Sequence, residues 1–379
     1  MTFEHREYRC QDGYPMRLFV CGDVMTGRGI DQILPHPCDP TLYEPNMRSA
    51  LGYVDLADRK SGEIPRAAPY DYIWGDALDE IDRREPDFRI VNLETSITAD
   101  GMPEAKGINY RMHPDNLGCI TAAEVDCCVL ANNHVADWGP NGLKDTVQAL
   151  GRTGIATSGA GVNAEEAARP AVLTLAAGTR LLVFAFACPS SGVPVHWAAE
   201  IGRPGVNFLA DFSRHAVQDI DRTLEQWRRP GDLVVVSIHW GLNWGYDIPN
   251  GHRNFAHSLV DEAGVDVVHG HSSHHPLGIE VHAGKPILYG CGDFINDYEG
   301  ISGYEAFRPD LALGYFLDID DRTRRLRAIE MVPFHLRKFR LERASRADAG
   351  WLGTMLDREC RRFGHTVRLT EDDALALSW

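Results

Sequence analysis

Four histidines fall within seven positions of the chain, at His269, His271, His274 and His275. The apolar run 265–268 before them is typical of a buried strand, and a second such run, 286–289, leads to Asp293. Neutral imidazole is a common ligand of transition metals, and side chains that follow strands gather at the end of a sheet. The residue types and their spacing therefore favour metal chemistry over packing alone.

The same pattern, an apolar run followed by a side chain that can bind a metal ion, recurs four more times. The runs are residues 17–21, 87–91, 126–130 and 232–238, and the side chains that follow them are Asp23, Glu94, Asn133 with His134, and His239. An aspartate after a strand is often only a helix cap, and a lone histidine is often a core residue, so the recurrence carries the argument. Because the carboxyl ends of the strands of an α/β sheet converge on one crevice, we expect these residues to meet there with His271 and His274.

Such a set of ligands suits two divalent metal ions. Two carboxylates, an amide oxygen and three imidazoles are what a two-metal site needs, with Glu94 as the natural bridge. Mixed nitrogen and oxygen ligands favour Mn²⁺, Zn²⁺ or Fe, and we expect Mn²⁺ first. The sequence offers no cysteine-based set of ligands, which argues against a structural zinc site.

The elements that must position these residues alternate between strand and helix. Apolar periodicity predicts helices over residues 71–84, 141–151, 212–228, 252–263 and 347–363, and residues 310–342 alternate like antiparallel strands. This order indicates an α/β layered fold with helices outside one or two sheets. No repeat or linker divides the chain. The prediction is a single domain over residues 1–379, with a core of about 16–335 and a C-terminal helical extension over 345–379.

Composition narrows the class of protein and its partners. The chain has 379 residues, 44% of them hydrophobic and 24% charged, which is typical of a soluble globular protein. Its net charge of −16 argues against nucleic acid or an anionic membrane as a partner. The nine cysteines are scattered and odd in number, and no signal peptide or membrane-spanning run is visible. We therefore expect reduced thiols and a cytoplasmic protein.

Six short motifs, taken in order, resemble those of the CapA-like proteins, which are named for poly-γ-glutamate capsule synthesis. They lie at residues 22–28, 92–95, 132–139, 239–241, 270–274 and 292–297. The fold of that family is similar to the calcineurin-like metallophosphoesterases, so the resemblance implies a layered β-sandwich flanked by helices, in the order α/β/β/α. It implies metal ligation by Asp23, Glu94, Asn133, His239, His271 and His274. It also implies that His134 is an acid/base residue near the metals, oriented by Asp137.

Three positions depart from the pattern that the resemblance implies. Family members usually carry Glu at the position of Asn243 and Asn at that of Asp293, and the phosphoesterases usually place a His at that of Met25. These differences predict weaker binding of one metal ion than in a phosphatase. Capsule-type members are typically anchored in a membrane, and the sequence shows no anchor, which disfavours a role in the capsule.

The CapA-like proteins also include soluble peptide epimerases of lasso-peptide biosynthesis. The resemblance therefore implies, first, a Cα epimerase that acts near the C-terminal end of a ribosomal precursor peptide. Removing a Cα proton next to a carboxylate creates an enediolate, whose charge two divalent ions can stabilise. Inversion needs a base on one face and an acid on the other. The candidates are His134 with Asp137, and His274 or His275, supported by Asp293 or Asp297.

Three other functions stay open. The first is phosphoester hydrolysis by a dinuclear centre, the reaction of the broader fold. The second is amide hydrolysis or ligation on poly-γ-glutamate, and the third is a non-catalytic, metal-stabilised binding protein. Side chains beside the predicted ligands are expected to contact the substrate, and they are Arg28, Trp240, Asn243, Trp244 and Asp297.

Overall fold

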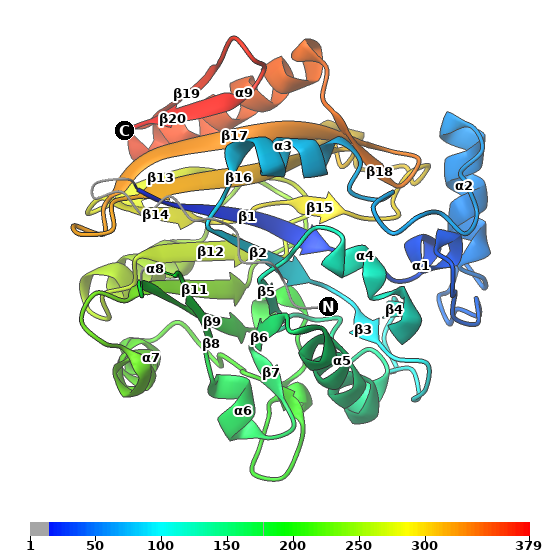
Figure 1. Cartoon of the computed structure of the whole chain (residues 1–379), viewed down its shortest axis with the longest axis horizontal. Coiled ribbons are helices and arrows are strands. Elements are labelled where there is room, and N and C mark those ends of the chain that lie inside the picture. The colour runs from blue at the N-terminus through cyan, green and yellow to red at the C-terminus, as the bar shows by residue number, and fades with distance from the viewer. Residues whose placement is uncertain (1–14, 177) are drawn as a thin grey trace.

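Two β-sheets stacked face to face form the centre of the molecule, and each has helices on its outer side (Figure 1). The structure is a computed structural model and describes residues 15–176 and 178–379. The sheets have ten and six strands. The predicted layered sandwich flanked by helices is therefore confirmed. Residues 1–14 and 177 of the domain predicted over 1–379 lie outside the described residues, as does the N-terminal segment that was searched for a signal peptide.

The larger sheet carries β1 near its middle. In spatial order its strands are β19 (Thr366–Leu369), β20 (Leu375–Ser378), β17 (Leu326–Arg337), β16 (Leu311–Ile319), β1 (Met16–Val24), β2 (Phe88–Leu93), β5 (Cys127–Val129) and β6 (Ala156–Ser158), with β15 (Asp293–Ile295) beside β1 and β18 (Arg340–Arg343) beside β17. The strands β1, β2, β5 and β6 are parallel, so their carboxyl ends lie at one edge. Helices α3 (Asp76–Arg84) and α9 (Arg346–Cys360) lie on its outer side (Figure 1).

The smaller sheet is buried on both faces. Its strands run in the order β13 (Ile279–His282), β14 (Lys285–Leu288), β12 (Val267–His271), β11 (Leu233–His239), β9 (Arg180–Ala187) and β8 (Ala171–Thr174). On β9, Leu181 and Val183 pack in the core between the sheets, whereas Leu182 and Phe184 pack against α7 (Arg214–Trp227) and α8 (Asn250–Asp261). Alternate side chains of a strand point to opposite faces, so both must be apolar here.

Shorter elements surround the strand ends. They are α1 (Gly29–Ile33), α2 (Leu51–Ser61), α4 (Gly118–Thr121), α5 (Gly139–Thr153) and α6 (Ala164–Ala168), with the strand pairs β3 (Ser96–Ile97) and β4 (Arg111–Met112), and β7 (Ala160–Gly161) and β10 (Gly205–Val206). The predicted helix over 71–84 begins only at Asp76, because Gly75 before it has φ 47°. Residues 71–75 instead form a turn.

The C-terminal segment differs from the helical extension predicted over 345–379. It begins with α9, whose first turn is capped by the Ser345 side chain, which accepts a hydrogen bond from the Asp348 amide. The chain then forms β19 and β20, which extend the edge of the larger sheet. On these strands Val367, Leu375 and Leu377 are buried, while Thr366, Arg368 and Ser378 are exposed, so side chains two residues apart share one face, as in a strand.

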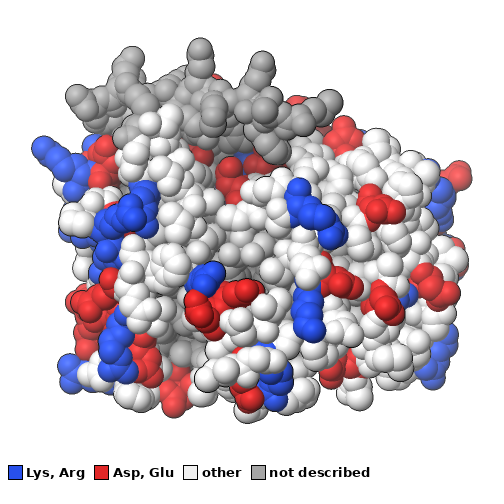
Figure 2. All heavy atoms as spheres, turned by 60° about the horizontal axis from the view of Figure 1, so that its bottom comes forward, with Lys and Arg blue, Asp and Glu red and all other residues white. Residues whose placement is uncertain are grey.

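No helix of the described residues is both long and apolar enough to cross a membrane. The eight described cysteines are free and buried. Basic and acidic side chains lie among one another over the face shown in Figure 2.

Candidate metal centre

The smaller sheet brings three histidines to its carboxyl edge. Strands β11 and β12 are parallel neighbours, with Ser237 in register with His269, and His239 in register with His271. These four residues continue the alternation of Val235 on β11 and Val267 on β12, whose side chains pack in the core between the two sheets. All four are almost completely buried. The predicted meeting of His239 and His271 is therefore found, with their Nδ1 atoms 2.8 Å apart.

The larger sheet brings three acidic residues to the same place. Asp23 near the end of β1 is in register with Asn92 on β2 and with Asp293 on β15. Glu94 directly follows β2, and its amide donates to the Val24 carbonyl at 3.0 Å. Strand ends of both sheets therefore supply the polar side chains of one centre.

Two groups of potential ligands share Asp23. The ligand atoms of Asp23, His239 and His271 lie within 4.8 Å of one another, and so do those of Asp23, His274 and Asp293. Glu94 lies beside the first group, with Oε1 3.9 Å from His239 Nε2. The sequence predicts Glu94 as the residue that bridges two ions. In the structure, Asp23 is the residue common to both ligand groups, and Glu94 lies beside only the first of them.

Two buried atoms of this centre, Asp23 Oδ2 and His239 Nε2, have no hydrogen-bond partner among the described residues. Leaving a buried polar atom unpaired is costly, and native proteins rarely do so. Both atoms can donate a lone pair, and the two residues share one ligand group. A divalent cation would satisfy them together, so these residues fit the predicted metal. Asn133 Oδ1, in the loop after β5, is also unpaired, and its predicted role as a ligand stays a prediction.

The electrostatics of the protein alone also indicate a missing positive charge. Burial, together with the charge of Asp293, raises the pKa of Asp23 to about 7. Burial and the neighbouring Asp23 raise the pKa of Glu94 well above its usual value. Burial lowers the pKa values of His239 and His271 well below the usual value, which keeps both imidazoles neutral, the form that binds a metal. A bound cation would remove the repulsion between the carboxylates.

His134 faces the centre from the loop after β5. Its Nδ1 lies 2.6 Å from Asp137 Oδ2, and its Nε2 lies 3.8 Å from Glu94 Oε1. The buried Asp137 also accepts a hydrogen bond from the Tyr110 amide at 2.6 Å. Because a carboxylate only accepts, Nδ1 carries the proton and Nε2 presents its lone pair to the centre. The pKa of His134 is lowered to about 4, mainly by burial and also by the charge of Lys106, while Asp137 acts in the opposite direction.

Lys106 and Asn92 belong to the site but escaped the sequence analysis. The Lys106 ammonium lies 2.7 Å from Asp137 Oδ1 and 3.3 Å from His134 Nδ1. Nothing in its polar loop indicates this contact. Asn92 donates to Asp23 Oδ1 at 2.7 Å and to Glu94 Oε2 at 3.1 Å. Asn92 does stand in the motif 92–95, and its place two residues before Glu94 on the same strand was the available signal.

The two histidines His274 and His275, both candidates for acid/base chemistry, have different surroundings. His274 Nδ1 lies 2.8 Å from Asp293 Oδ1, inside the centre. His275 points away, where its Nε2 accepts from the Gly245 amide at 3.1 Å and its ring stacks on Phe307 with centroids 4.7 Å apart. The predicted catalytic role of His275 has no support in this geometry, because its ring packs against Phe307 and its Nε2 is taken up by the Gly245 amide.

Arg28 and Asp297, both predicted to contact substrate, instead contact each other. Arg28 Nε donates to Asp297 Oδ2 at 2.8 Å, and its guanidinium also lies 3.1 Å from Glu44 and over the Tyr53 ring. All of these side chains are buried. Because Arg28 and Asp297 are paired and buried beside α1, neither side chain is accessible to a substrate.

The two tryptophans predicted to line the site lie in different surroundings. Trp240 is 2% exposed, stacks on His252 and donates from Nε1 to the Tyr289 carbonyl at 2.8 Å. It follows His239 directly and therefore lies on the opposite, helix-covered face. Trp244 is half-buried, stacks on Tyr304 with centroids 4.0 Å apart, and lies 5.2 Å from the His274 ring.

Alanine at these two tryptophans should therefore have opposite effects. Trp240→Ala should lower the free energy of unfolding by about 3–5 kcal/mol, because it empties a packed core position. Trp244→Ala should cost only about 1 kcal/mol of stability but lower kcat/KM, because its ring lies beside His274. Urea denaturation and steady-state kinetics of both variants measure this. Equal losses of stability would contradict the assignment.

Asn243 lies over the second ring nitrogen of His274. Its amide nitrogen is 2.8 Å from His274 Nε2, and its carbonyl accepts a hydrogen bond from the His274 amide at 2.9 Å. Asn243 is exposed at the surface. The predicted substrate contact by Asn243 thus lies at the entrance to the centre.

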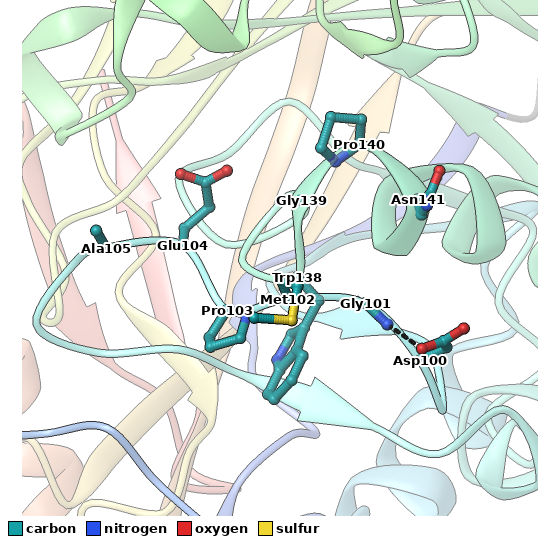
Figure 3. A pocket seen from close by; sticks show the side chains of 10 residues that line it. All are labelled: Asp100, Gly101, Met102, Pro103, Glu104, Ala105, Trp138, Gly139, Pro140 and Asn141. Carbon is teal, nitrogen blue, oxygen red and sulfur yellow. Dashed lines mark hydrogen bonds between the residues drawn. The ribbon is translucent and has the colours of Figure 1, made fainter.

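A surface pocket of about 490 Å³ opens beside the start of α5, in the segment that directly follows Asp137. Figure 3 shows the two segments that form it, residues 100–105 and residues 138–141 at the start of α5. The Glu104 amide donates to the Asp137 carbonyl at 2.8 Å, so the pocket wall is tied to the histidine–aspartate pair.

The fold and the site define a layered α/β protein with a candidate centre for divalent metal ions where strand ends of both sheets meet. The chain belongs to the family of bacterial capsule synthesis proteins, PGA_cap, whose model matches residues 17–298. The predicted resemblance to CapA-like proteins is thus confirmed, while the lasso-peptide branch stays a prediction.

Individual relatives extend this result over most of the chain. A probable polyglutamine synthesis accessory protein of Mycobacterium tuberculosis is 48% identical over 358 residues, which cover 94% of this chain and 94% of that protein. The PGA biosynthesis protein CapA of Bacillus subtilis is 30% identical over 298 residues, which cover 78% of this chain and 66% of that protein. A solved structure of a phosphatase from Mycoplasma pneumoniae is 11% identical with a TM-score of 0.49, covering 85% of this chain and 94% of that one.

Proposed function

We propose that this protein is a metal-dependent enzyme that inverts a Cα centre next to a carboxylate in a peptide chain. The observation that carries the proposal is the pair of histidines beside one cluster of carboxylates: His134 with its lone pair toward Glu94, and His274 paired with Asp293. Inversion at Cα needs two acid/base groups at one centre.

His134 is suited to accept the Cα proton at Nε2. Asp137 holds the Nδ1 proton in place and would stabilise the imidazolium that forms, as the aspartate of a catalytic triad does. The hydrogen bond between His134 Nδ1 and Asp137 Oδ2, at 2.6 Å, fixes the ring. Lys106 donates to the other carboxylate oxygen, Asp137 Oδ1, at 2.7 Å and so helps to hold the orientation of Asp137.

His274 is suited to return a proton on the second face. Burial alone would lower its pKa, but Asp293 and then Asp23 outweigh burial, so that the pKa is raised. A raised and a lowered pKa at one site mark the acid and the base. The Asn243 side chain covers His274 Nε2, so a substrate must displace this exposed amide before the proton can be delivered.

The metal centre would hold the carboxylate of the substrate. Divalent ions bound by Asp23, Glu94, Asn133, His239 and His271 supply positive charge, which orients a carboxylate and lowers the cost of negative charge beside it. Asn92 donates to Asp23 and to Glu94, and so keeps both side chains directed into the centre. These contacts position ligands and take no part in proton transfer.

Two substrate classes are supported. The mycobacterial relative is named for polyglutamine synthesis and the Bacillus relative for PGA biosynthesis, which supports a glutamyl chain. A ribosomal precursor peptide is the second class, because the CapA-like proteins that the motifs resemble also include peptide epimerases. Both are chains with carboxylates.

Hydrolysis of a phosphoester or an amide is the second candidate function. The observation that favours it is the position of Asp23 in two ligand groups, because two adjacent metal sites that share a ligand are the arrangement of many hydrolases. His134 would then serve the leaving group instead of a Cα proton.

One experiment separates these functions. The protein loaded with Mn²⁺ is incubated in D₂O with glutamate oligomers and, separately, with p-nitrophenyl phosphate. We expect deuterium to enter the oligomer at Cα without any shortening of the chain, and mass spectrometry measures both. Shortened chains or released nitrophenol without deuterium would replace epimerisation by hydrolysis. No turnover, together with a Tm that falls on chelation, would indicate a binding protein.

A further inference from the structure

A second cluster of metal-binding side chains lies between α8 and the edge strand β13. His257 and Asp261 are four residues apart on α8 and share one face of that helix. Glu280 and His282 are two residues apart on β13 and share one face of that strand. The ligand atoms of His257, Glu280 and His282 lie within 4.8 Å of one another.

This cluster is remote from the centre described above. The ligands His239 and His271 stand at the carboxyl ends of β11 and β12. On the edge strand, His282 pairs with Lys285, the first residue of β14, and β14 is parallel to β12. The cluster therefore lies at the amino end of the parallel strands, at the opposite edge of the smaller sheet.

The two imidazoles direct their Nε2 atoms at two carboxylates. Their rings stack with centroids 3.9 Å apart and planes 8° apart. His282 Nε2 lies 2.8 Å from Asp261 Oδ2. His257 Nε2 lies 3.0 Å from Glu280 Oε1 but has no properly aligned hydrogen bond to any described residue. This buried nitrogen therefore has an unused lone pair or proton that points into the cluster.

We propose that His257, Glu280, His282 and Asp261 bind one divalent transition-metal ion. Two imidazoles and two carboxylates make up the four mixed ligands that Zn²⁺ or Co²⁺ takes in a tetrahedral site. The ion would cross-link the outer helix α8 to the edge strand β13. Its role is structural, because the ligands come from an outer helix and an edge strand at the end of the sheet opposite the first centre.

Two neighbours of Glu280 set the strength of this site. The Tyr289 hydroxyl donates to Oε2 at 2.7 Å, which orients the carboxylate and leaves Oε1 toward the histidines. Arg253 donates to that same Oε1 at 3.1 Å. Its positive charge competes with a metal ion for the oxygen, so removing the charge should strengthen binding.

Titration of the full chain with Co²⁺ after removal of all metal tests this site. Replacing both histidines, by His257→Gln and His282→Asn, should remove one bound Co²⁺ per chain and leave the others. His215→Asn, which changes an exposed histidine on α7, is the matched control and should bind as the wild type does. Arg253→Gln should bind this ion several-fold more tightly. Asp23→Asn should lose ions of the first centre and retain this one.

Equal stoichiometry and affinity in the double variant and the wild type would overturn the proposal. Should the double variant not fold, the Arg253→Gln and Asp23→Asn variants test the proposal. Unchanged affinity in Arg253→Gln, or the loss of every bound ion in Asp23→Asn, would also overturn it. Because activity is not a readout here, failure of this proposal leaves the proposed epimerase function untouched.

Discussion

Asp23→Asn is expected to lower turnover by about 10³-fold and to remove most of the metal from the centre. Asp23 is the side chain that both ligand groups share, so its loss weakens both at once. Metal ions contribute several kcal/mol to catalysis, and a loss of about 4 kcal/mol corresponds to about 10³ in rate. Metal content by atomic emission and turnover with the preferred substrate measure the effect.

The same variant should change stability in the opposite direction when no metal is present. The pKa of Asp23 is raised to about 7 by burial and by Asp293, so above that pH its charge opposes folding. A neutral amide removes this cost, and the metal-free variant should be more stable than the metal-free wild type at pH 8. The difference should be constant above pH 7 and should shrink as the pH falls from 7 to about 4, where the aspartate of the unfolded chain becomes protonated too. Melting curves with chelator at pH 8 and at about pH 5 measure it.

Asp293→Asn tests the second ligand group separately from the first. It replaces a buried carboxylate by an amide beside His274 and outside the group of Asp23, His239 and His271. Because Asp293 raises the pKa of His274, the proposed acid, kcat should fall by about 10²- to 10⁴-fold while the ion of the first group is retained. Full metal content and full activity in Asp23→Asn would refute the centre.

Much of the centre could be predicted because strand ends follow from apolar runs. Asp23, Glu94 and His239 each follow such a run, and parallel strands bring their ends to one edge. The direction of a side chain at a strand end was harder to predict. Trp240 and His275 each neighbour a residue of the centre, yet both point away from it. A shift of one residue along a strand moves a side chain to the other face.

Contacts between distant loops could not be predicted from the sequence. Lys106 reaches Asp137 from a polar loop whose composition does not distinguish it from solvated loops. Arg28 and Asp297 are 269 residues apart in the sequence and form a buried ion pair that no sequence pattern indicates. The C-terminal strands β19 and β20 were missed for a different reason. Each has four residues, too few for the alternation to outweigh a helical neighbour.

His134→Asn is expected to lower kcat by 10²- to 10⁴-fold, the range for loss of a general acid/base group, with the metal content unchanged. The reason is geometric, because His134 Nε2 lies 3.8 Å from Glu94 Oε1 and is outside both ligand groups that contain Asp23. Asparagine keeps a polar side chain but cannot take up a proton. Turnover, metal content and deuterium uptake at Cα in D₂O are the three measurements.

His275→Asn separates the structural assignment from the one made on sequence alone. Both histidines were candidates for acid/base chemistry, but His275 packs on Phe307 and Trp244 and accepts a backbone hydrogen bond. Its replacement should lower Tm, because a buried ring is lost from an aromatic cluster, while kcat stays within about tenfold of the wild type, well short of the loss that removal of an acid/base group causes.

Loss of metal from His134→Asn would make His134 a ligand instead of a base. A 10³-fold drop in kcat for His275→Asn at full metal content would return the second proton transfer to His275 and remove it from His274.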